Sequence, residues 1–376
     1  MKKIVVLGSG LVGKVMAADL CKEYDVTIAD INKPALDLIA KNHNVQIAGC
    51  DFSKKEDLIK LLSPFDLVIG AVPGFMGFET LKTIIESGKN VVDISFFPEE
   101  ALELDALAKK YNVTAVVDCG VAPGMCNIIA GFHNKRMKIN RYECLVGGLP
   151  QKKEWPFEYK AVFSPIDVIE EYTRPARFVE NKNLIVREAL SDVVEEEFED
   201  IGKLESFNSD GLRSLISTFS HVPNMKEKTL RYSGHAELMR IFRETGLFNK
   251  EKISVKGVEI SPLDLMTKLL FPKWKMIEGD EDFTVMRVTI EGEESDLPVT
   301  YIYNLYDKFD RETKTTSMAR TTGFTCTAAA HLVLENRFIR KGISPPEYLG
   351  EEEACFRFVL KYLEERGVKY KMDVIK

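Results

Sequence analysis

The chain of 376 residues predicts an α/β protein, in which a doubly wound parallel sheet is followed by an α+β domain with a mixed sheet. Three observations support this prediction. Short apolar runs alternate with amphipathic stretches over the first third of the chain, a glycine-rich turn follows the first run, and the pattern changes after Pro123-Gly124. The length fits two domains, and 45% hydrophobic with 29% charged residues fits a globular protein.

The first third has the rhythm of a parallel sheet that helices cover on both faces. Its β-branched runs are short and continuous rather than alternating, as expected for strands buried on both sides. We predict strands at 4–7, 26–29, 45–48, 67–71, 91–94 and 113–117. We predict helices between them at 12–24, 34–41, 54–62, 78–87 and 98–111. This order of elements is typical of a doubly wound sheet.

A glycine pattern, G-x-G-x-x-G, joins the first predicted strand to the first helix. It is formed by Gly8, Ser9, Gly10, Leu11, Val12 and Gly13. Gly8 permits the tight turn, Gly10 lets a pyrophosphate approach the backbone, and Gly13 lets the helix lie close to the strand. The free N–H groups and positive dipole end of the helix would then face the phosphates. These residues predict a dinucleotide-binding site in a Rossmann domain.

An acidic residue ends the second predicted strand. Asp30 stands 17 residues after Gly13, where a carboxylate would accept hydrogen bonds from the adenosine ribose hydroxyls. A carboxylate there would repel a 2′-phosphate, and no arginine follows it to bind one. We therefore expect NAD as the cofactor in preference to NADP, while the nearby Lys33 leaves NADP open.

The overall composition narrows the class of protein. There are 51 Lys and Arg against 58 Asp and Glu, and this net charge of −7 argues against an extended nucleic-acid surface. The 7 cysteines are scattered and lack a C-x-x-C pair, so we expect reduced thiols, no metal site and a cytoplasmic protein. No apolar run approaches the roughly 20 residues that span a bilayer, so we expect no membrane partner.

The chain after residue 123 mixes strands with polar loops. We predict strands at 141–147, 283–290, 300–304 and 313–319, and helices at 213–218, 236–245, 262–270, 325–340 and 352–366. The acidic run at 192–200 reads as a solvated surface. The two domains are expected at 1–122 and 123–376, with the helices of about 325–376 packing back toward the first domain.

Candidate site residues follow the strands of the first domain. In open sheets of this kind, ligands lie at the carboxyl ends of the strands, near the switch in strand order. We expect cofactor contacts from Asp51, Phe52, Ala71, Val72, Pro73 and Asp93. Asp118 follows the last of these strands, and Gly-rich turns come directly after it. A structural role in turns or helix caps is the alternative for Asp93 and Asp118.

The second domain offers candidate substrate binders in two segments. Tyr159 and Lys160 lie in an aromatic loop with interspersed charges, and Arg231, Tyr232 and His235 lie in a second segment. A guanidinium is a natural bidentate partner for a carboxylate, so Arg231 is the candidate for binding a substrate carboxylate. From spacing alone, both segments also fit ordinary surface loops.

Five segments together resemble the saccharopine dehydrogenase-like oxidoreductases, and among them the L-lysine 6-dehydrogenases. The resemblance spans essentially the whole chain. It rests on the glycine turn, on Asp118-Cys119-Gly120-Val121-Ala122-Pro123-Gly124-Met125, on Val146-Gly147-Gly148-Leu149-Pro150, on Thr229-Leu230-Arg231-Tyr232-Ser233-Gly234-His235-Ala236-Glu237, and on Met318-Ala319-Arg320-Thr321-Thr322. Lys160 departs from the pattern of the lysine dehydrogenases and leaves the exact substrate open.

The resemblance implies oxidation of a carbon that bears nitrogen, with a nicotinamide cofactor. In related enzymes, residues that match Asp118 and Arg231 contact the substrate. We expect Asp118 to accept or relay the proton of the substrate amine, or to hold the amine, and Arg231 to bind the α-carboxylate. We expect NAD-dependent oxidation of the terminal amine of L-lysine to the 6-semialdehyde with release of ammonia, in a homodimer. A saccharopine or carboxyspermidine dehydrogenase is the alternative within this fold, and a non-catalytic dinucleotide sensor is the alternative outside enzymes.

Overall fold

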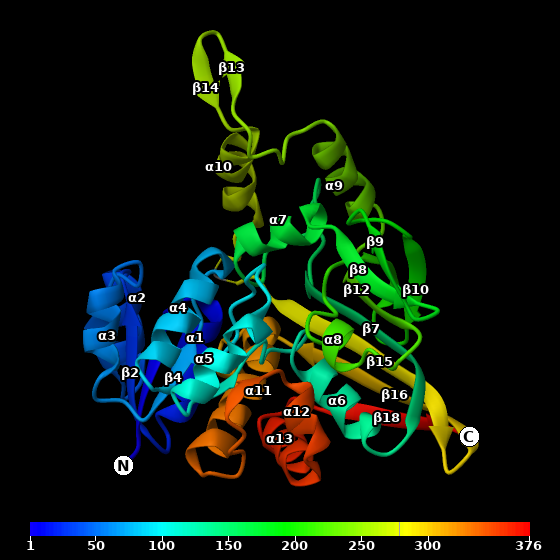
Figure 1. The fold of residues 1–376 in the computed structure, drawn as a ribbon. Helices are drawn as coiled ribbons and strands as arrows, with labels where there is room; N and C mark the ends of the chain where they lie inside the picture. Colours follow the sequence, from blue (N-terminus) through cyan, green and yellow to red (C-terminus); the bar gives the residue numbers. More distant parts are fainter. Residues whose placement is uncertain (278) are drawn as a thin grey trace.

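The computed structural model describes residues 1–277 and 279–376, which form two joined α/β bodies (Figure 1). The first body is built on a parallel sheet with the strand order β17-β6-β5-β4-β1-β2-β3. Its strands are β1 (Lys3–Leu7), β2 (Asp25–Asp30), β3 (Gln46–Gly49), β4 (Leu67–Gly70), β5 (Asn90–Asp93), β6 (Thr114–Val116) and β17 (Gly342–Ser344). The strand order reverses at β1, which pairs with β2 on one side and β4 on the other.

Helices cover both faces of this sheet, which confirms the predicted doubly wound fold. They are α1 (Leu11–Leu20), α2 (Lys33–Asn42), α3 (Lys55–Leu62), α4 (Gly74–Glu86), the 3-10 helix η1 (Ala101–Leu104) and α5 (Asp105–Lys110). Alternate residues of β1 point to opposite faces: Ile4 and Val6 pack with α1 and α2, whereas Val5 and Leu7 pack with α3, α4 and α5. Both faces are apolar, which is why the strands read as continuous hydrophobic runs.

The C-terminal part of the chain also packs on the first body. Strand β17 extends the parallel sheet beside β6, and helix α11 (Ser317–Leu334) packs along α1. The buried carboxylate of Asp19 on α1 accepts hydrogen bonds from Thr327 of α11, Tyr362 of α13 (Glu353–Glu365) and Arg366, at 2.7–2.9 Å. These contacts connect the end of the chain to the first helix.

The second body is built on the predicted mixed sheet. Its main strand order is β10-β11-β12-β7-β15-β16-β18, with β8 and β9 attached beside β12. The strands are β7 (Lys138–Pro150), β8 (Ala176–Glu180), β9 (Asn183–Arg187), β10 (Val194–Phe198), β11 (Gly202–Asn208), β12 (Met225–Arg231), β15 (Asp282–Glu294), β16 (Leu297–Lys308) and β18 (Tyr370–Ile375). Strands β7 and β12 run parallel, and their other neighbours in this sheet run antiparallel to them.

Several helices and one hairpin complete the second body. They are α6 (Met125–Asn134), α7 (Pro165–Thr173), α8 (Leu215–Thr218), α9 (His235–Glu244), α10 (Pro262–Trp274), α12 (Glu347–Glu351) and the strands β13 (Ile253–Val255) and β14 (Val258–Ile260). Helix α10 and the β13–β14 hairpin project away from the rest of the molecule as an arm (Figure 1). Within the described residues, no helix is long and apolar enough to span a bilayer.

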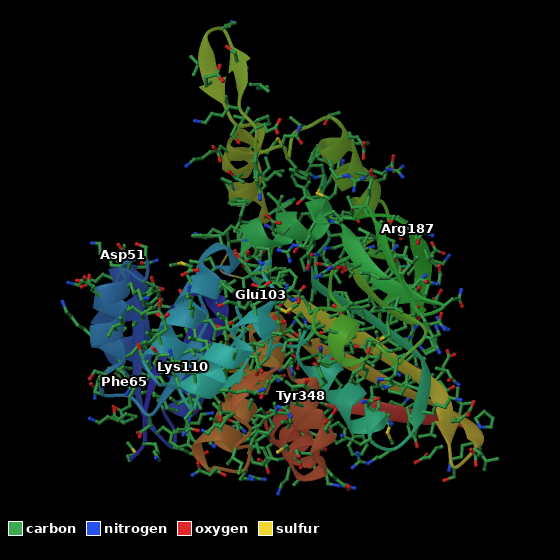
Figure 2. All side chains as sticks on the ribbon, viewed as in Figure 1. Asp51, Phe65, Glu103, Lys110, Arg187 and Tyr348 are labelled. Carbon is green, nitrogen blue, oxygen red and sulfur yellow. The ribbon has the colours of Figure 1, made fainter. Side chains whose placement is uncertain are left out.

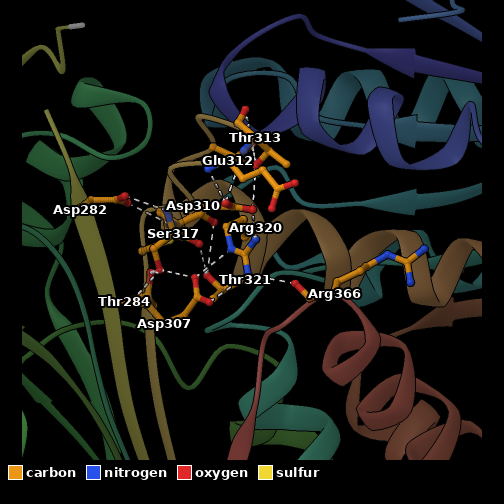
Figure 3. A network of polar contacts seen from close by, with 12 residues as sticks. Asp282, Thr284, Asp307, Asp310, Glu312, Thr313, Ser317, Arg320, Thr321 and Arg366 are labelled. Atoms are coloured by element: carbon orange, nitrogen blue, oxygen red, sulfur yellow. Dashed lines mark hydrogen bonds and ion pairs between the residues drawn. The ribbon is translucent and has the colours of Figure 1, made fainter. Parts of the chain in front are cut away.

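The predicted strand at 313–319 is wrong, because helix α11 begins at Ser317 instead. A buried carboxylate from a distant strand starts this helix: Asp282 accepts hydrogen bonds from the backbone N–H groups of Ser317 and Met318 at 2.7 and 3.0 Å. Arg320 pairs with Asp307 and Asp310 in the same network (Figure 3). The β-branched threonines of this segment favour a strand, but these long-range contacts favour the helix.

The carboxyl ends of the parallel strands meet at the edge of the first body that lies nearer α7. Figure 2 shows Asp51, which follows β3, at the upper edge of this body, whereas Phe65 and Lys110, which precede β4 and β6, lie lower. Ligands of doubly wound sheets bind at the carboxyl edge, next to the switch in strand order. The fold therefore predicts a ligand site in the space between β1, β4 and the second body.

Candidate active site

A cavity of about 780 Å³ occupies this space and has walls from both bodies. The first body contributes the glycine turn and the ends of β2 to β6, and the second contributes α7, β7, β12 and the start of α11. The predicted residues that line the cavity are Gly8, Gly10, Leu11, Val12, Gly13, Asp30, Asp51, Phe52, Ala71, Val72, Pro73, Asp118 and Arg231. One cavity thus brings together residues that are more than 200 positions apart in the chain.

The glycine turn has the geometry that a dinucleotide needs. Gly8 has a φ of +114°, and a Cβ there would lie 2.4 Å from the backbone oxygen of Ala71. A Cβ at Gly13 would lie 2.0 Å from the oxygen of Gly8, so only glycine lets the helix approach the turn. At Gly10, by contrast, a Cβ would meet nothing within 4 Å, because this position faces open space. The turn therefore leaves room for phosphates beside the N-terminus of α1.

Asp30 is held at the end of β2 by the glycine turn itself. Its Oδ2 accepts hydrogen bonds from the backbone N–H and the hydroxyl of Ser9, at 2.6 and 2.8 Å. Its Oδ1 accepts from the N–H of Asn32 at 2.8 Å. Ser9 therefore orients the carboxylate, although it does not itself belong to the cavity wall formed by the described residues.

Asp93 is held inside the protein by hydrogen bonds to a neighbouring residue. It is fully buried, and its two oxygens accept hydrogen bonds from the N–H and the hydroxyl of Ser95, at 2.8 and 3.1 Å. Burial raises the pKa of the Asp93 carboxyl to about 8. Asp93 packs against Gly70, and it is Ser95, not Asp93, that faces the cavity. Asp93 thus shapes the loop behind the cavity wall.

Asp118 faces the cavity as part of a buried ion pair. The two nitrogens Nε and Nη2 of Arg213 donate to its two oxygens at 3.1 and 3.2 Å, and each side chain is only 5% exposed. Asp118 has a φ of +52°, a left-handed conformation that the glycine-rich turn after β6 imposes on it. Burial opposes the charge of Arg213, but the charge of Asp118 raises the pKa of this guanidinium overall. The ion pair thus favours the charged guanidinium of Arg213.

Arg231 lines the cavity, and every nitrogen of its guanidinium donates a hydrogen bond. Its Nη2 donates to Glu171 at 2.5 Å, its Nε to the hydroxyl of Tyr172 at 3.2 Å, and its Nη1 to the backbone oxygen of Leu230 at 2.9 Å. Behind it, the hydroxyl of Tyr172 lies 3.0 Å from Nε2 of His235. The arginine is thus oriented by α7 and by its own strand, with its position fixed before any ligand binds.

His235 ends this chain of hydrogen bonds as a neutral ring. Its Nδ1 lies 2.9 Å from the backbone oxygen of Phe157, which can only accept, so Nδ1 carries the proton. Burial, with the charge of Arg231, lowers the pKa of His235 to about 3. The neutral Nε2 therefore accepts from the hydroxyl of Tyr172, which in turn accepts from Arg231. His235 supports Arg231 from behind.

The other predicted substrate binders also lie outside the cavity wall of the described residues. The ring of Tyr159 lies 4.6 Å below the guanidinium carbon of Arg231 and is buried. Lys160 pairs with Glu154 and Asp280 at 3.3 and 3.6 Å. The hydroxyl of Tyr232 donates to the backbone oxygen of Pro150 at 2.9 Å. Tyr159 supports Arg231, whereas Lys160 and Tyr232 contact other parts of the second body.

The structure adds cavity residues that the sequence analysis did not single out. The charged ones among them are Asp167, Glu170, Glu171, Arg174, Asp210 and Glu227. A signal for one of them exists in strand β12, where Glu227, Thr229 and Arg231 alternate along the strand and share one face. The signal for Asp167, Glu170 and Glu171 is weaker, because α7 reads as an ordinary amphipathic helix.

A buried group of potential metal ligands lies behind the cavity, although the scattered cysteines did not suggest one. One ligand atom from each of Cys126, Cys144 and Glu227 lies within 4.8 Å of the others. Burial raises the pKa of the Cys144 thiol well above its ordinary value, which favours the protonated form that does not bind metals. The grouping is therefore also consistent with a packed core contact.

Two models of known protein families match the chain. The model described as "Saccharopine dehydrogenase C-terminal domain" matches residues 118–368, and the model described as "Saccharopine dehydrogenase NADP binding domain" matches residues 4–116. The chain belongs to the saccharopine dehydrogenase family. This membership confirms the resemblance seen in the motifs. It identifies the first body as a dinucleotide-binding domain of the saccharopine dehydrogenase type.

Individual members of the saccharopine dehydrogenase family are distant in sequence. The mitochondrial alpha-aminoadipic semialdehyde synthase of Bos taurus is 22% identical over 442 residues, which cover 98% of this chain and 47% of that protein. The chain thus spans about half the length of that curated relative and less of others. The family membership therefore describes these domains rather than the whole of the longer relatives.

Two solved structures confirm the fold. The apo saccharopine dehydrogenase (L-Glu forming) of Saccharomyces cerevisiae has a TM-score of 0.80 at 18% identity, with 100% of both chains covered. The homospermidine synthase of Legionella pneumophila, solved in complex with NAD, has a TM-score of 0.68 at 12% identity and covers 100% of this chain and 91% of that one. At these identities the likeness concerns the fold alone.

Proposed function

We propose that the protein is a nicotinamide-dinucleotide-dependent oxidoreductase that acts on a carbon bearing an amino group. The observation that carries this proposal is the single cavity that runs from the open glycine turn to the charged groups Asp118 and Arg231. The membership of the saccharopine dehydrogenase family supports it. When bound, the nicotinamide ring supplies the hydride acceptor, and the residues of the cavity bind and orient the substrate.

We propose NAD in preference to NADP as the cofactor. The carboxylate of Asp30, oriented by Ser9, is in position to bind ribose hydroxyls and would repel a 2′-phosphate. The matching family model is described as NADP binding, so the preference needs a direct comparison. Titration of the intrinsic fluorescence with NADH and NADPH gives it; tighter binding of NADPH would contradict the proposal.

For the substrate we propose the terminal amine of L-lysine, which would be oxidised to the 6-semialdehyde with release of ammonia. Arg231 would bind the α-carboxylate, and Asp118, oriented by Arg213, would bind the reacting nitrogen. Overall, one ammonium substrate, one oxidised dinucleotide and one water give an aldehyde, an ammonium ion, a reduced dinucleotide and a proton. The acids along α7 favour such a cationic substrate.

Two alternatives stay open beside lysine. A saccharopine or carboxyspermidine dehydrogenase would use the same cavity for a secondary amine, and the fold shared with a homospermidine synthase is compatible with a polyamine. A protein that senses the dinucleotide without catalysis would keep the glycine turn but would not need the oriented Arg231. The ordered charges around Arg231 make the enzyme the better interpretation.

An absorbance assay tests all these candidates at once. The purified protein is incubated with NAD or NADP and with lysine, saccharopine, carboxyspermidine or a polyamine, and the formation of the reduced dinucleotide is recorded. We expect the highest kcat/KM with lysine and NAD. Activity with another amine would change the substrate, whereas tight dinucleotide binding without activity on any amine would favour the sensor.

We also propose that two copies associate through the arm of α10 and the β13–β14 hairpin. The arm carries exposed apolar side chains that the rest of the described chain does not cover, including Val258 and Leu269 at 60% and 55% exposure. Such side chains are typical of surfaces that bind another protein. Light scattering of the purified protein tests the assembly state.

A further inference from the structure

One acidic side chain in the cavity lacks the partner that its neighbours have. Glu227 lies on β12, on the face that it shares with Thr229 and Arg231, and it is only 5% exposed. Within the residues that the structure describes, its buried Oε2 has no hydrogen-bonding partner. A buried carboxyl of this kind is costly unless another group satisfies it. The cavity that it lines can admit such a group.

Unlike Glu227, the neighbouring acids of the described chain each pair with an arginine. Asp118 pairs with Arg213 at 3.1 Å, Asp210 with Arg177 at 2.8 Å, and Glu171 with Arg231 at 2.5 Å. These three carboxylates therefore have their own cations. Glu227 is bordered by the same acids and by no cation that donates a hydrogen bond to it within the described chain. The local field at Glu227 favours an incoming positive charge.

The absence of a side chain at Gly211 leaves room for the carboxyl of Glu227. A Cβ at Gly211 would lie 1.9 Å from its Oε1, so any larger residue at that position would displace it. The thiols of Cys126 and Cys144 lie within 4.8 Å of a carboxyl oxygen of Glu227, and they carry no positive charge. Glu227 also lines the cavity, so a bound ligand can come close to its side chain.

We propose that Glu227 binds the reacting amino group of the substrate and takes up its proton. This inference rests on the proposed function and assigns a residue to its proton step. The N–H bond of the substrate ammonium breaks, an O–H bond forms on Glu227, and the electron pair stays on nitrogen. That lone pair is what the nitrogen needs to form a C=N bond when the adjacent carbon loses its hydride to the dinucleotide.

The proton affinity of Glu227 suits this role. Burial raises its pKa from 4.5 to about 8, and the charges of Asp210, Glu171 and Asp118 act in the same direction against the opposing charge of Arg213. A general base works best when its pKa lies near the working pH. Asp118 already pairs with Arg213, and in this proposal it holds the charged nitrogen.

The test compares Glu227→Gln with Glu180→Gln, a matched control on the adjacent strand β8, whose acid is 43% exposed and pairs with Lys226. The amine that is oxidised best by the wild type serves as substrate. For each variant, kcat/KM is measured from pH 6.5 to 10.5, NADH binding is measured by fluorescence, and folding by melting temperature. Metal content is measured in the wild type and in Glu227→Gln.

We expect Glu227→Gln to bind NADH as the wild type does and to lose about 10²-fold in kcat/KM at pH 8, the lower end of the usual contribution of a general base. In the wild type, kcat/KM should rise through pH 8. In the variant this rise should move toward the pKa of a free amine, about 10.4 for a lysine side chain. Glu227→Asp should recover part of the rate, and Glu180→Gln should match the wild type.

Three outcomes would overturn the inference in distinguishable ways. If the wild type oxidises amines and Glu227→Gln keeps both its rate and its pH profile, this role of Glu227 is wrong and the proposed function stands. Stoichiometric zinc that is lost in Glu227→Gln would make the carboxylate a metal ligand instead. If the wild type oxidises no amine, the proposed function fails, and this inference fails with it.

Discussion

At the scale of single residues, the cavity is organised by buried pairs between acids and arginines. Asp118 with Arg213 and Glu171 with Arg231 place fixed charges of both signs in or beside the cavity wall. Each pair has at least one member that is almost fully buried, where charge–charge interactions are stronger than in water and an unpaired charge is costly. If these pairs bind the substrate as proposed, their substitution should affect both the reaction and the stability of the fold.

Replacement of Asp118 by Asn tests this link. Asn keeps the size of the side chain but leaves the buried guanidinium of Arg213 without a charged partner. We expect a loss of about 3 kcal/mol of folding free energy, a severe loss of amine oxidation and unchanged NADH binding. Denaturant unfolding, the NADH absorbance assay and fluorescence titration measure these effects. Normal turnover in the variant would exclude a direct role for Asp118.

Glu227 also predicts how stability depends on pH. Because its folded pKa of about 8 lies above the ordinary 4.5, the folded state holds this proton more tightly than the unfolded state. The resulting stability is fully present below pH 4.5 and is lost as the pH rises to 8. Glu227→Gln has no such loss, so its melting temperature should exceed that of the wild type by several degrees more at pH 9 than at pH 5. An equal difference at both values would contradict a raised pKa.

The sequence could predict the residues whose role depends on local backbone chemistry. The glycine turn and Asp30 need only a strand, a turn and a helix in order, and their spacing identified them. Lys160 and His235 had the right chemistry, but tertiary packing turned them toward Glu154 and Phe157. Glu227 was missed because a charged residue in a strand does not reveal which of its faces is covered.

At the scale of elements, the first domain was readable because both faces of its strands are apolar and each helix follows its strand directly. Helix α11 was harder, since its start at Ser317 depends on Asp282, a residue 35 positions earlier in the chain. Strand β17 was missed because it is only 3 residues long and reaches the sheet from the far end of the chain. Such elements are specified by long-range contacts rather than by local pattern.

Asp282→Asn tests the start of α11. The buried carboxylate accepts from two backbone N–H groups at 2.7 and 3.0 Å, and an amide oriented to accept one of them would leave or repel the other. We expect a loss of about 1–3 kcal/mol, seen as a melting temperature several degrees lower. Because Met318 and Thr322 of this helix line the cavity, NADH or substrate binding should weaken as well. A control at the exposed Glu312 should leave both unchanged.

At the scale of the whole molecule, the second body both completes the cavity and carries the arm. Strands β7 and β12 contribute Gly147, Gly148 and Arg231 to the cavity beside the carboxyl edge of the parallel sheet. Neither body alone therefore forms the cavity. The arm lies on the α7 side of the second body and is attached through α10, whose Trp274 is buried against the aromatic cluster behind Arg231. The arm and Arg231 therefore contact the same aromatic side chains.

The arm gives the last prediction. Leu265 and Leu269 are 48% and 55% exposed and stand one helical turn apart on α10, so they form one apolar face of the arm. If two copies pair through this face, replacing both leucines by Asp should shift the mass measured by light scattering from dimer to monomer with little change in the fold. Leu38→Asp, at a 62% exposed position on α2, is the matched control and should stay dimeric. A wild-type monomer, or a dimer that survives the double substitution, would exclude the arm as the interface.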